Sequence, residues 1–186
     1  PGPLTMIFEK SEIVPYETTG GLETVAVRMP SNLIAMELIR AGGGYISAPS
    51  ANTSGRPSPT KAEHVADDLN GKIEMILDGG SVEIGLESTI VDMTVEPPMI
   101  LRPGAITKEM LEQEIGEVDV DRTILSADSH QAPKAPGMKY RHYAPKADLI
   151  IVEGEPEEET KAIRQLVYEQ VRKGEKTGVI ATTESA

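Results

Sequence analysis

The chain contains no cysteine, no tryptophan and only one phenylalanine among its 186 residues. Without cysteine it has no disulfide bonds and no thiolate metal sites, and this composition favours a reducing, cytoplasmic compartment. No apolar run approaches the roughly 20 residues that a membrane-spanning helix needs. Because aromatic side chains are scarce, the hydrophobic core must be built from Ile, Val, Leu and the eight Met residues.

Positive charge is also in short supply. The 18 Lys and Arg residues are outnumbered by 30 Asp and Glu, which gives a formal net charge of −12. Such a charge opposes non-specific attraction to nucleic acid. Five Glu lie within residues 153–159, whereas residues 53–61 and 134–146 are locally basic. The balance argues against a simple nucleic-acid-binding module, although a polyanion could dock on the two basic segments.

Hydrophobic patterning over the first 115 residues predicts an α/β protein of the α+β type, with a twisted mixed sheet and flanking helices. Ser31 and Thr60 are predicted N-caps, and Glu63 completes a capping-box pattern with Thr60. The last two strands should form a hairpin. Strands are expected at 4–8, 25–30, 45–48, 75–78, 88–93 and 98–102, and helices at 31–40, 60–69 and 107–115.

The remaining residues predict a linker over 116–146 and then the beginning of a small Rossmann-like α/β domain over 147–186. Within that domain the pattern reads as a strand, a helix and a strand, at 147–152, 157–173 and 177–182. One such unit cannot form a stable sheet by itself. We therefore expect a chain that is truncated at both ends, whose residues 1–115 are the C-terminal portion of a catalytic domain.

The densest group of polar side chains lies in residues 47–59, directly after a predicted buried strand. Short hydroxyls, an amide, a glycine and an arginine can present many donors to anionic oxygens. Ligands of α/β sheets bind at strand ends, which suits this position. The commoner interpretation of such a pattern is an ordinary surface turn.

Two arginines belong to predicted strands. Arg28 interrupts an apolar strand, where its charge needs a carboxylate or an anionic ligand as partner. A structural ion pair is the commoner explanation. Arg102 ends a strand just before Pro103 and Gly104, and the hydroxyls of Ser88 and Thr89 begin another. Taken together, the arginines and the hydroxyl clusters favour an anion site.

Histidine gives little catalytic signal, because His64 and His130 are expected to be solvated. His142 belongs to residues 138–143, a mixture of cations and aromatics that suits a nucleotide, although it also suits a linker that joins two domains. No nucleophile–base pair or metal-ligand spacing stands out. Nucleotidyl transfer needs neither, because positioning and charge neutralisation with Mg²⁺ can lower the barrier.

Five stretches, in this order, resemble the YrdC-like threonylcarbamoyl-AMP synthase family: residues 1–5, 24–30, 48–55, 87–90 and 101–104. Residues 136–145 match the linker of longer members, which carry an extra C-terminal α/β domain. The resemblance implies that L-threonine, bicarbonate and ATP condense to threonylcarbamoyl-AMP and pyrophosphate. The product serves to form N6-threonylcarbamoyladenosine in tRNA.

Carried over residue by residue, the resemblance assigns three groups of positions. Threonine would contact Arg28, Ala48 and Ser88. ATP, arriving with Mg²⁺, would contact Thr24, Ser50, Asn52, Ser58, Arg102, Tyr140 and His142. No catalytic residue is clear, and Ser50, Asn52 and Arg102 would act by positioning. The sequence patterns predict no metal ligand in the protein and no membrane partner. The resemblance makes tRNA or a downstream threonylcarbamoyl transferase a candidate partner.

The sequence departs from the family in lacking a threonine-rich nucleotide segment and a Lys-x-Arg pair. Residues 42–45 also differ from the apolar approach expected before the Ser-x-Asn signature. The 186 residues alone are therefore expected to hold half an active site and to be inactive.

Two alternatives stay open. The first is the related carbamoyl-transfer domain of hydrogenase maturation, which normally brings a Cys-rich zinc segment that this cysteine-free chain lacks. The second is a non-catalytic double-stranded RNA or tRNA binder, disfavoured by the net charge of −12 and by the few aromatics. Retained tRNA binding without ATP binding would favour the second.

Overall fold

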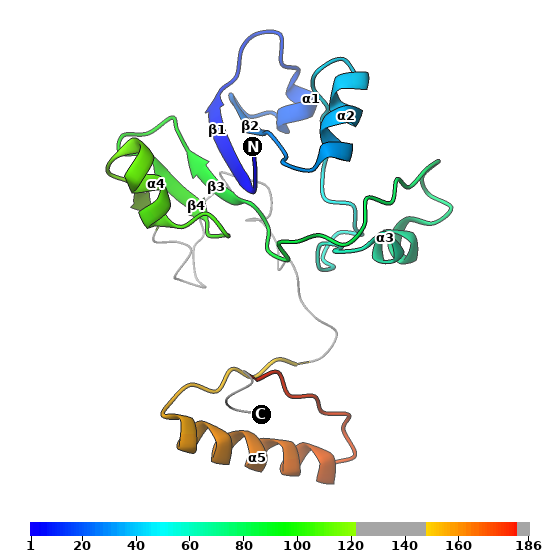
Figure 1. Cartoon of the computed structure of the whole chain (residues 1–186), viewed down its shortest axis with the longest axis vertical. Coiled ribbons are helices and arrows are strands. Elements are labelled where there is room, and N and C mark those ends of the chain that lie inside the picture. Colours follow the sequence, from blue (N-terminus) through cyan, green and yellow to red (C-terminus); the bar gives the residue numbers. More distant parts are fainter. Residues whose placement is uncertain (122–147, 182–186) are drawn as a thin grey trace. The chain divides into compact units, whose positions relative to one another are not determined.

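The computed structural model describes residues 1–121 and 148–181, and the chain comprises two compact units, Pro1–Ala144 and Pro145–Ala186 (Figure 1). The first unit contains a five-stranded sheet in the order β2-β1-β3-β4-β5. β1 pairs antiparallel with β2 and parallel with β3, and β4 pairs antiparallel with β3 and parallel with β5. The predicted mixed sheet with flanking helices is confirmed. The strands are Leu4–Glu9, Thr24–Arg28, Thr89–Asp92, Met99–Arg102 and Asp119–Val120.

The described residues of this unit form four helices: α1 (Tyr16–Thr19), α2 (Leu33–Ala41), α3 (Ala62–Leu69) and α4 (Lys108–Ile115). The start of α4 is as predicted, because the side chain of Thr107 accepts from the Met110 amide at 3.3 Å. The other two predicted caps are wrong. Asn32, not Ser31, caps α2 and accepts from the Ala35 amide at 3.0 Å.

Thr60 does not cap α3, because it lies one residue before the N-cap position, which Lys61 occupies without a side-chain cap bond. The Thr60 amide instead donates to Nδ1 of His64 at 3.3 Å. A capping box requires the hydroxyl at the N-cap itself. The N-cap of α3 therefore lies one residue later than the sequence pattern predicts.

The core is aliphatic, as the composition requires. Its buried hydrophobic residues in the described part of the chain are all Ile, Val or Leu. Val91 and Ile100 pack with Leu111 and Val118, which places α4 against β3 and β4 (Figure 1). A second cluster joins Ile7, Ile90 and Leu101. The three central strands, β1, β3 and β4, are therefore held together by buried aliphatic contacts.

The predicted strands at 45–48 and 75–78 do not form. Tyr45 is 85% exposed and Met75 is 72% exposed, so neither segment is buried either. Gly43 and Gly44 adopt φ of +101° and +98° after α2, which few other residues could do. A short apolar run becomes a strand only where a neighbouring backbone pairs with it, and these runs meet none among the described residues.

In the second unit, α5 (Pro156–Arg172) confirms the predicted helix. Three Glu in its first turn and Arg172 in its last turn suit the helix dipole. The flanking segments at 148–155 and 174–181 run as chain without strand pairing, so the predicted strands are wrong where the structure describes them. Across residues 1–121 and 148–181, no helix combines the length and apolarity needed to cross a membrane.

Candidate functional site

Three polar residues from separate parts of the sequence meet at the sheet. Thr5 of β1 and Ser88, just before β3, share a hydrogen bond of 2.7 Å between their hydroxyls. Arg102, the last residue of β4, donates from Nε to the Ser88 carbonyl at 3.0 Å and from Nη2 to the Ser88 hydroxyl at 3.2 Å. Ser88 is only 7% exposed. The structure thus brings together two residues singled out from sequence, Ser88 and Arg102, and adds Thr5.

The backbone around this cluster is fixed by Thr89, which is fully buried. Its hydroxyl donates to the Ile106 carbonyl at 2.7 Å and accepts from the Ile106 amide at 3.1 Å. Gly104 lies so close that an added Cβ would stand 2.6 Å from both the Glu87 carbonyl and the Thr89 amide. Only glycine fits this approach. The two motif segments, 87–89 and 102–106, are therefore locked together through backbone contacts.

Arg28 lies opposite Thr5 in the antiparallel register of β1 and β2. Opposed residues of such a pair share one face of the sheet. The Nε atom of Arg28 donates to the Gly2 carbonyl at 3.0 Å. Arg28, Thr5, Ser88 and Arg102 consequently form a polar row across β2, β1, β3 and β4.

The expectation that the charge of Arg28 is buried in an apolar strand is wrong. Its side chain is exposed, because β2 is an edge strand of the sheet, so burial does not force the charge to find a partner. Within the described part of the chain Arg28 forms no ion pair, and its two terminal nitrogens remain available. The predicted structural ion pair is absent there, whereas an anionic ligand could still bind.

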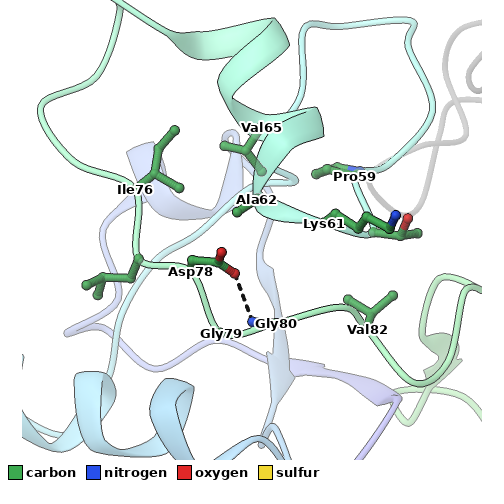
Figure 2. A pocket seen from close by; sticks show the side chains of 11 residues that line it. Pro59, Lys61, Ala62, Val65, Ile76, Asp78, Gly79, Gly80 and Val82 are labelled. Atoms are coloured by element: carbon green, nitrogen blue, oxygen red, sulfur yellow. Dashed lines mark hydrogen bonds between the residues drawn. The ribbon is translucent and has the colours of Figure 1, made fainter.

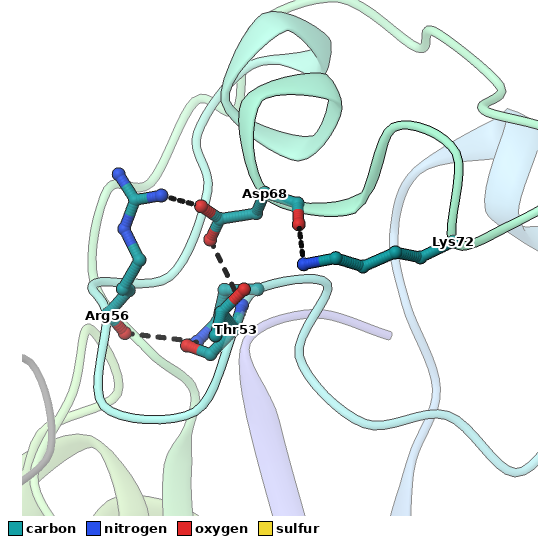
Figure 3. Close-up of polar contacts among 5 residues, drawn as sticks. Thr53, Arg56, Asp68 and Lys72 are labelled. Carbon is teal, nitrogen blue, oxygen red and sulfur yellow. Dashed lines mark hydrogen bonds and ion pairs between the residues drawn. The ribbon is translucent and has the colours of Figure 1, made fainter.

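The hydroxyl-rich loop is closed on itself and on α3 (Figure 3). The side-chain amide of Asn52 donates to the carbonyls of Thr53 and Arg56, at 3.0 Å each. Asp68, in the last turn of α3, accepts from the Thr53 amide at 3.0 Å and forms an ion pair with Arg56. Oδ1 of Asn52 is buried and accepts no hydrogen bond from any described residue. Arg56 is thus neutralised by Asp68 and adds less positive potential than its sequence position indicates.

The other residues predicted to contact threonine or ATP differ in their burial and setting. Ala48 and Ser50 are exposed in the loop, and Ser58 is partly buried near its end. Thr24 begins β2, is partly buried and pairs with Glu9. Tyr140 and His142 lie outside the described residues, as does most of the predicted 116–146 linker.

A pocket of about 170 Å³ lies between the start of α3 and residues 76–82 (Figure 2). Apolar side chains such as Val65, Ile76 and Val82 line it beside Lys61. Oδ1 of Asp78 accepts a hydrogen bond from the Gly80 amide at 2.9 Å. Pockets for drug-sized ligands are typically about 300–1,000 Å³, so this one is too small to enclose a nucleotide.

Sequence reasoning missed Thr5 and Asp68. Thr5 lies among the apolar residues of β1, which was a usable signal, because a partly buried hydroxyl favours a hydrogen-bond partner. Asp68 had no such signal, since its sequence context is that of any polar helix face and only the fold brings it to Thr53. No group of three or more His, Asp or Glu side chains within residues 1–121 and 148–181 could hold a metal ion.

Comparison with known proteins gives two family matches. Residues 1–104 match the Sua5/YciO/YrdC family model, described as telomere recombination, and residues 106–186 match the model of the threonylcarbamoyl-AMP synthase C-terminal domain. The matches agree with the resemblance inferred from the motifs.

Relatives and solved structures are similar over nearly the whole chain. A threonylcarbamoyl-AMP synthase of Pyrococcus abyssi is 51% identical over 98% of this chain and 53% of its own length. One of Bacillus subtilis is 50% identical over 100% of this chain and 52% of its own. The crystal structure of P. abyssi Sua5 complexed with L-threonine has a TM-score of 0.89 at 49% identity, covering 97% of this chain and 54% of that one. The chain spans about half the length of the relatives it matches.

Proposed function

Because the chain belongs to the Sua5/YciO/YrdC family, we propose that its protein is a threonylcarbamoyl-AMP synthase. It would condense L-threonine, bicarbonate and ATP to threonylcarbamoyl-AMP and pyrophosphate for tRNA modification. The observation that carries this proposal is the polar row Arg28–Thr5–Ser88–Arg102. The row joins a predicted threonine contact at one end to a predicted ATP contact at the other.

In this proposal the guanidinium of Arg28 receives the threonine carboxylate. The Nε atom is occupied by Gly2, but the two terminal nitrogens can form the bidentate contact that suits a carboxylate. Ser88 and Ala48 would line the rest of the amino-acid site. That the P. abyssi structure is a complex with L-threonine supports an amino-acid site in this fold.

The nucleotide would be held by Arg102 and by the loop that carries Ser50, Asn52 and Ser58, with Thr24 as a further contact. Three of the five guanidinium N–H groups of Arg102 remain after its two bonds to Ser88, and they can meet phosphate oxygens. The exposed hydroxyl of Ser50 and the half-buried hydroxyl of Ser58 can add further donors. Mg²⁺ would arrive with the phosphates of ATP, because the described loop offers hydroxyls, amides and guanidinium groups rather than a carboxylate cluster.

Chemically, the threonine amine would first take up bicarbonate as an N-carboxylate, with loss of water. That carboxylate would then attack the α-phosphorus of ATP, and pyrophosphate would leave. No general base among these residues is needed, since the barrier can be lowered by orienting the two anions and neutralising their charge. We place this nucleotidyl transfer in the cytosol, and we propose that Tyr140 and His142 cover the nucleotide during it.

The test is pyrophosphate release by the protein at its natural length. Release should require threonine and bicarbonate together with ATP. Ser50→Ala should reduce the rate at least tenfold with little change in melting temperature, and Asn52→Ala should lower both, because the Asn52 amide also closes the loop. Ser81→Ala, an exposed serine outside the site, should leave the rate unchanged. Turnover of carbamoyl phosphate instead, or tRNA binding without ATP binding, would favour the alternative functions. The 186-residue chain by itself should be inactive, because it spans only about half the length of the relatives that it matches.

Replacing Arg28 separates the two ligand sites. Arg28→Ala should weaken threonine binding by about 2–4 kcal/mol, as expected for a lost charge-assisted contact, and should change ATP affinity much less. Isothermal titration of each ligand against the natural-length protein measures both values. Equal weakening of the two ligands would show that Arg28 is only structural.

A further inference from the structure

Asp68 is a carboxylate that the proposed reaction does not use, yet its side chain is only 5% exposed. Burying a carboxylate costs free energy unless donors and an opposite charge compensate it. Both oxygens of Asp68 are compensated, one by the Thr53 amide at 3.0 Å and the other by the Arg56 guanidinium. The compensation comes from a loop that lies 12 to 15 residues earlier in the chain.

The two partners of Asp68, Thr53 and Arg56, both follow the signature asparagine, Asn52, in the chain. Thr53 follows Asn52 directly, and Arg56 follows Gly55, whose φ of +86° turns the loop back. The Asn52 amide group then closes the loop by donating to the carbonyls of these same two residues. Asn52 therefore has no free donor for a ligand and its Oδ1 is buried, so its side chain shapes the loop that carries the exposed Ser50.

Lys72 adds a second connection at the same turn of α3, because its ammonium group donates to the Asp68 carbonyl at 2.9 Å. The backbone that carries the Asp68 carboxylate is thereby tied down as well. The position of the Asn52 loop thus depends on a carboxylate that is itself fixed on a helix.

We propose that Asp68 is a positioning residue for the nucleotide. It holds the Asn52 loop against α3, and in this way it sets the affinity for ATP without touching ATP. The proposal rests on the proposed function, in which Asn52 serves the nucleotide. It assigns threonine affinity to other residues, because Arg28 and Ser88 take no part in this network.

The experiment compares Asp68→Asn with Asp67→Asn in the natural-length protein. Asp67 is the adjacent residue and is exposed, so the two variants lose the same charge at neighbouring positions. Asp68→Asn keeps the size of the side chain but removes its charge from Arg56. We expect it to raise the Kd of ATP about 3- to 30-fold, the range found for residues that modulate a site through a contact network. The Kd of threonine should stay within about twofold, and Asp67→Asn should change neither.

A second variant removes the same ion pair from its exposed end. Arg56→Met takes away the other member of the pair, a side chain that is 48% exposed, and leaves the Asp68 carboxylate without its counter-charge. It should also weaken ATP selectively. An Arg56→Met change in the Asp68→Asn background should add little, because the two groups act through one contact.

The outcomes separate the two proposals. If the unmodified protein binds no ATP, the proposed function is refuted and this inference with it. If the unmodified protein binds ATP and both Asp68→Asn and Arg56→Met leave its Kd unchanged, or weaken ATP and threonine equally, the positioning role alone is overturned. A lower melting temperature with unchanged affinities would likewise mean that Asp68 only stabilises the fold.

Discussion

Replacing Thr89 by Val tests whether one hydroxyl holds the two motif segments together. The Thr89 side chain is fully buried at the start of β3, and its hydroxyl forms bonds of 2.7 and 3.1 Å to the carbonyl and amide of Ile106. Val has nearly the same shape but offers neither a donor nor an acceptor. The change therefore removes both bonds while filling the same space.

The expected magnitude follows from the groups left unpaired. Each buried polar group that loses its partner costs about 1–3 kcal/mol. Two such groups on Ile106, which is itself only partly buried, give an expected loss of about 2–4 kcal/mol in the free energy of unfolding. Thr89→Ser keeps the hydroxyl and loses one methyl group, which should cost only about 1 kcal/mol.

Urea denaturation of the natural-length protein, followed by far-ultraviolet circular dichroism, measures both variants under the same conditions. Thr89→Val should unfold at clearly lower urea than Thr89→Ser. If the two variants differ by less than about 0.5 kcal/mol, within the usual scatter of such comparisons, the hydroxyl does not lock the segments and the reasoning is wrong.

Two further changes probe the same region and the helix beside it. Gly104→Ala should destabilise by about 1–3 kcal/mol through overpacking, because its Cβ would meet backbone at 2.6 Å; Gly85→Ala, where a Cβ meets nothing within 4 Å, is the control in the same urea assay. The pKa of Glu109 is lowered, first by its backbone hydrogen bond and then by the Thr107 side chain. A carboxylate whose pKa is lowered in the folded state stabilises the fold at pH above its unfolded pKa, near 4.5, and this contribution is lost as pH falls through the folded pKa. Glu109→Gln should therefore make the free energy of unfolding fall less steeply with acidification. An NMR titration of Glu109 with a midpoint at or above 4.5 would contradict this prediction.

Local features were predictable from the sequence because their causes are local. The hairpin of β3 and β4 joins strands that are neighbours in the chain, and α4 begins where Thr107 can cap it. The aliphatic core followed from composition alone. Ser88 and Arg102 lie at one end of this hairpin, and the structure places them in direct contact.

Features that depend on distant neighbours were missed or misjudged. The runs at 45–48 and 75–78 have the apolar character of strands but meet no pairing partner within the described residues. Arg28 was interpreted as a buried charge because its neighbours in sequence are apolar, yet β2 is an edge strand and leaves it exposed. Whether a strand is central or at an edge is a property of the whole sheet, so no local pattern could supply it.

Arg102, predicted to contact ATP, is bonded directly to Ser88, which is predicted to contact threonine. Its guanidinium donates one hydrogen bond to the Ser88 carbonyl and one to the Ser88 hydroxyl. That hydroxyl also forms a hydrogen bond with the hydroxyl of Thr5, which lies opposite Arg28 in the sheet. A shift of any one of these groups therefore moves its neighbours. In the proposed reaction the N-carboxylate formed on threonine must reach the α-phosphorus of ATP, and a row fixed by side-chain and backbone bonds would hold the proposed threonine and ATP contacts at one separation. In this interpretation the short Ser88 side chain is a spacer between the two proposed contacts, and its burial follows from its bonds to Thr5 and to the half-buried Arg102.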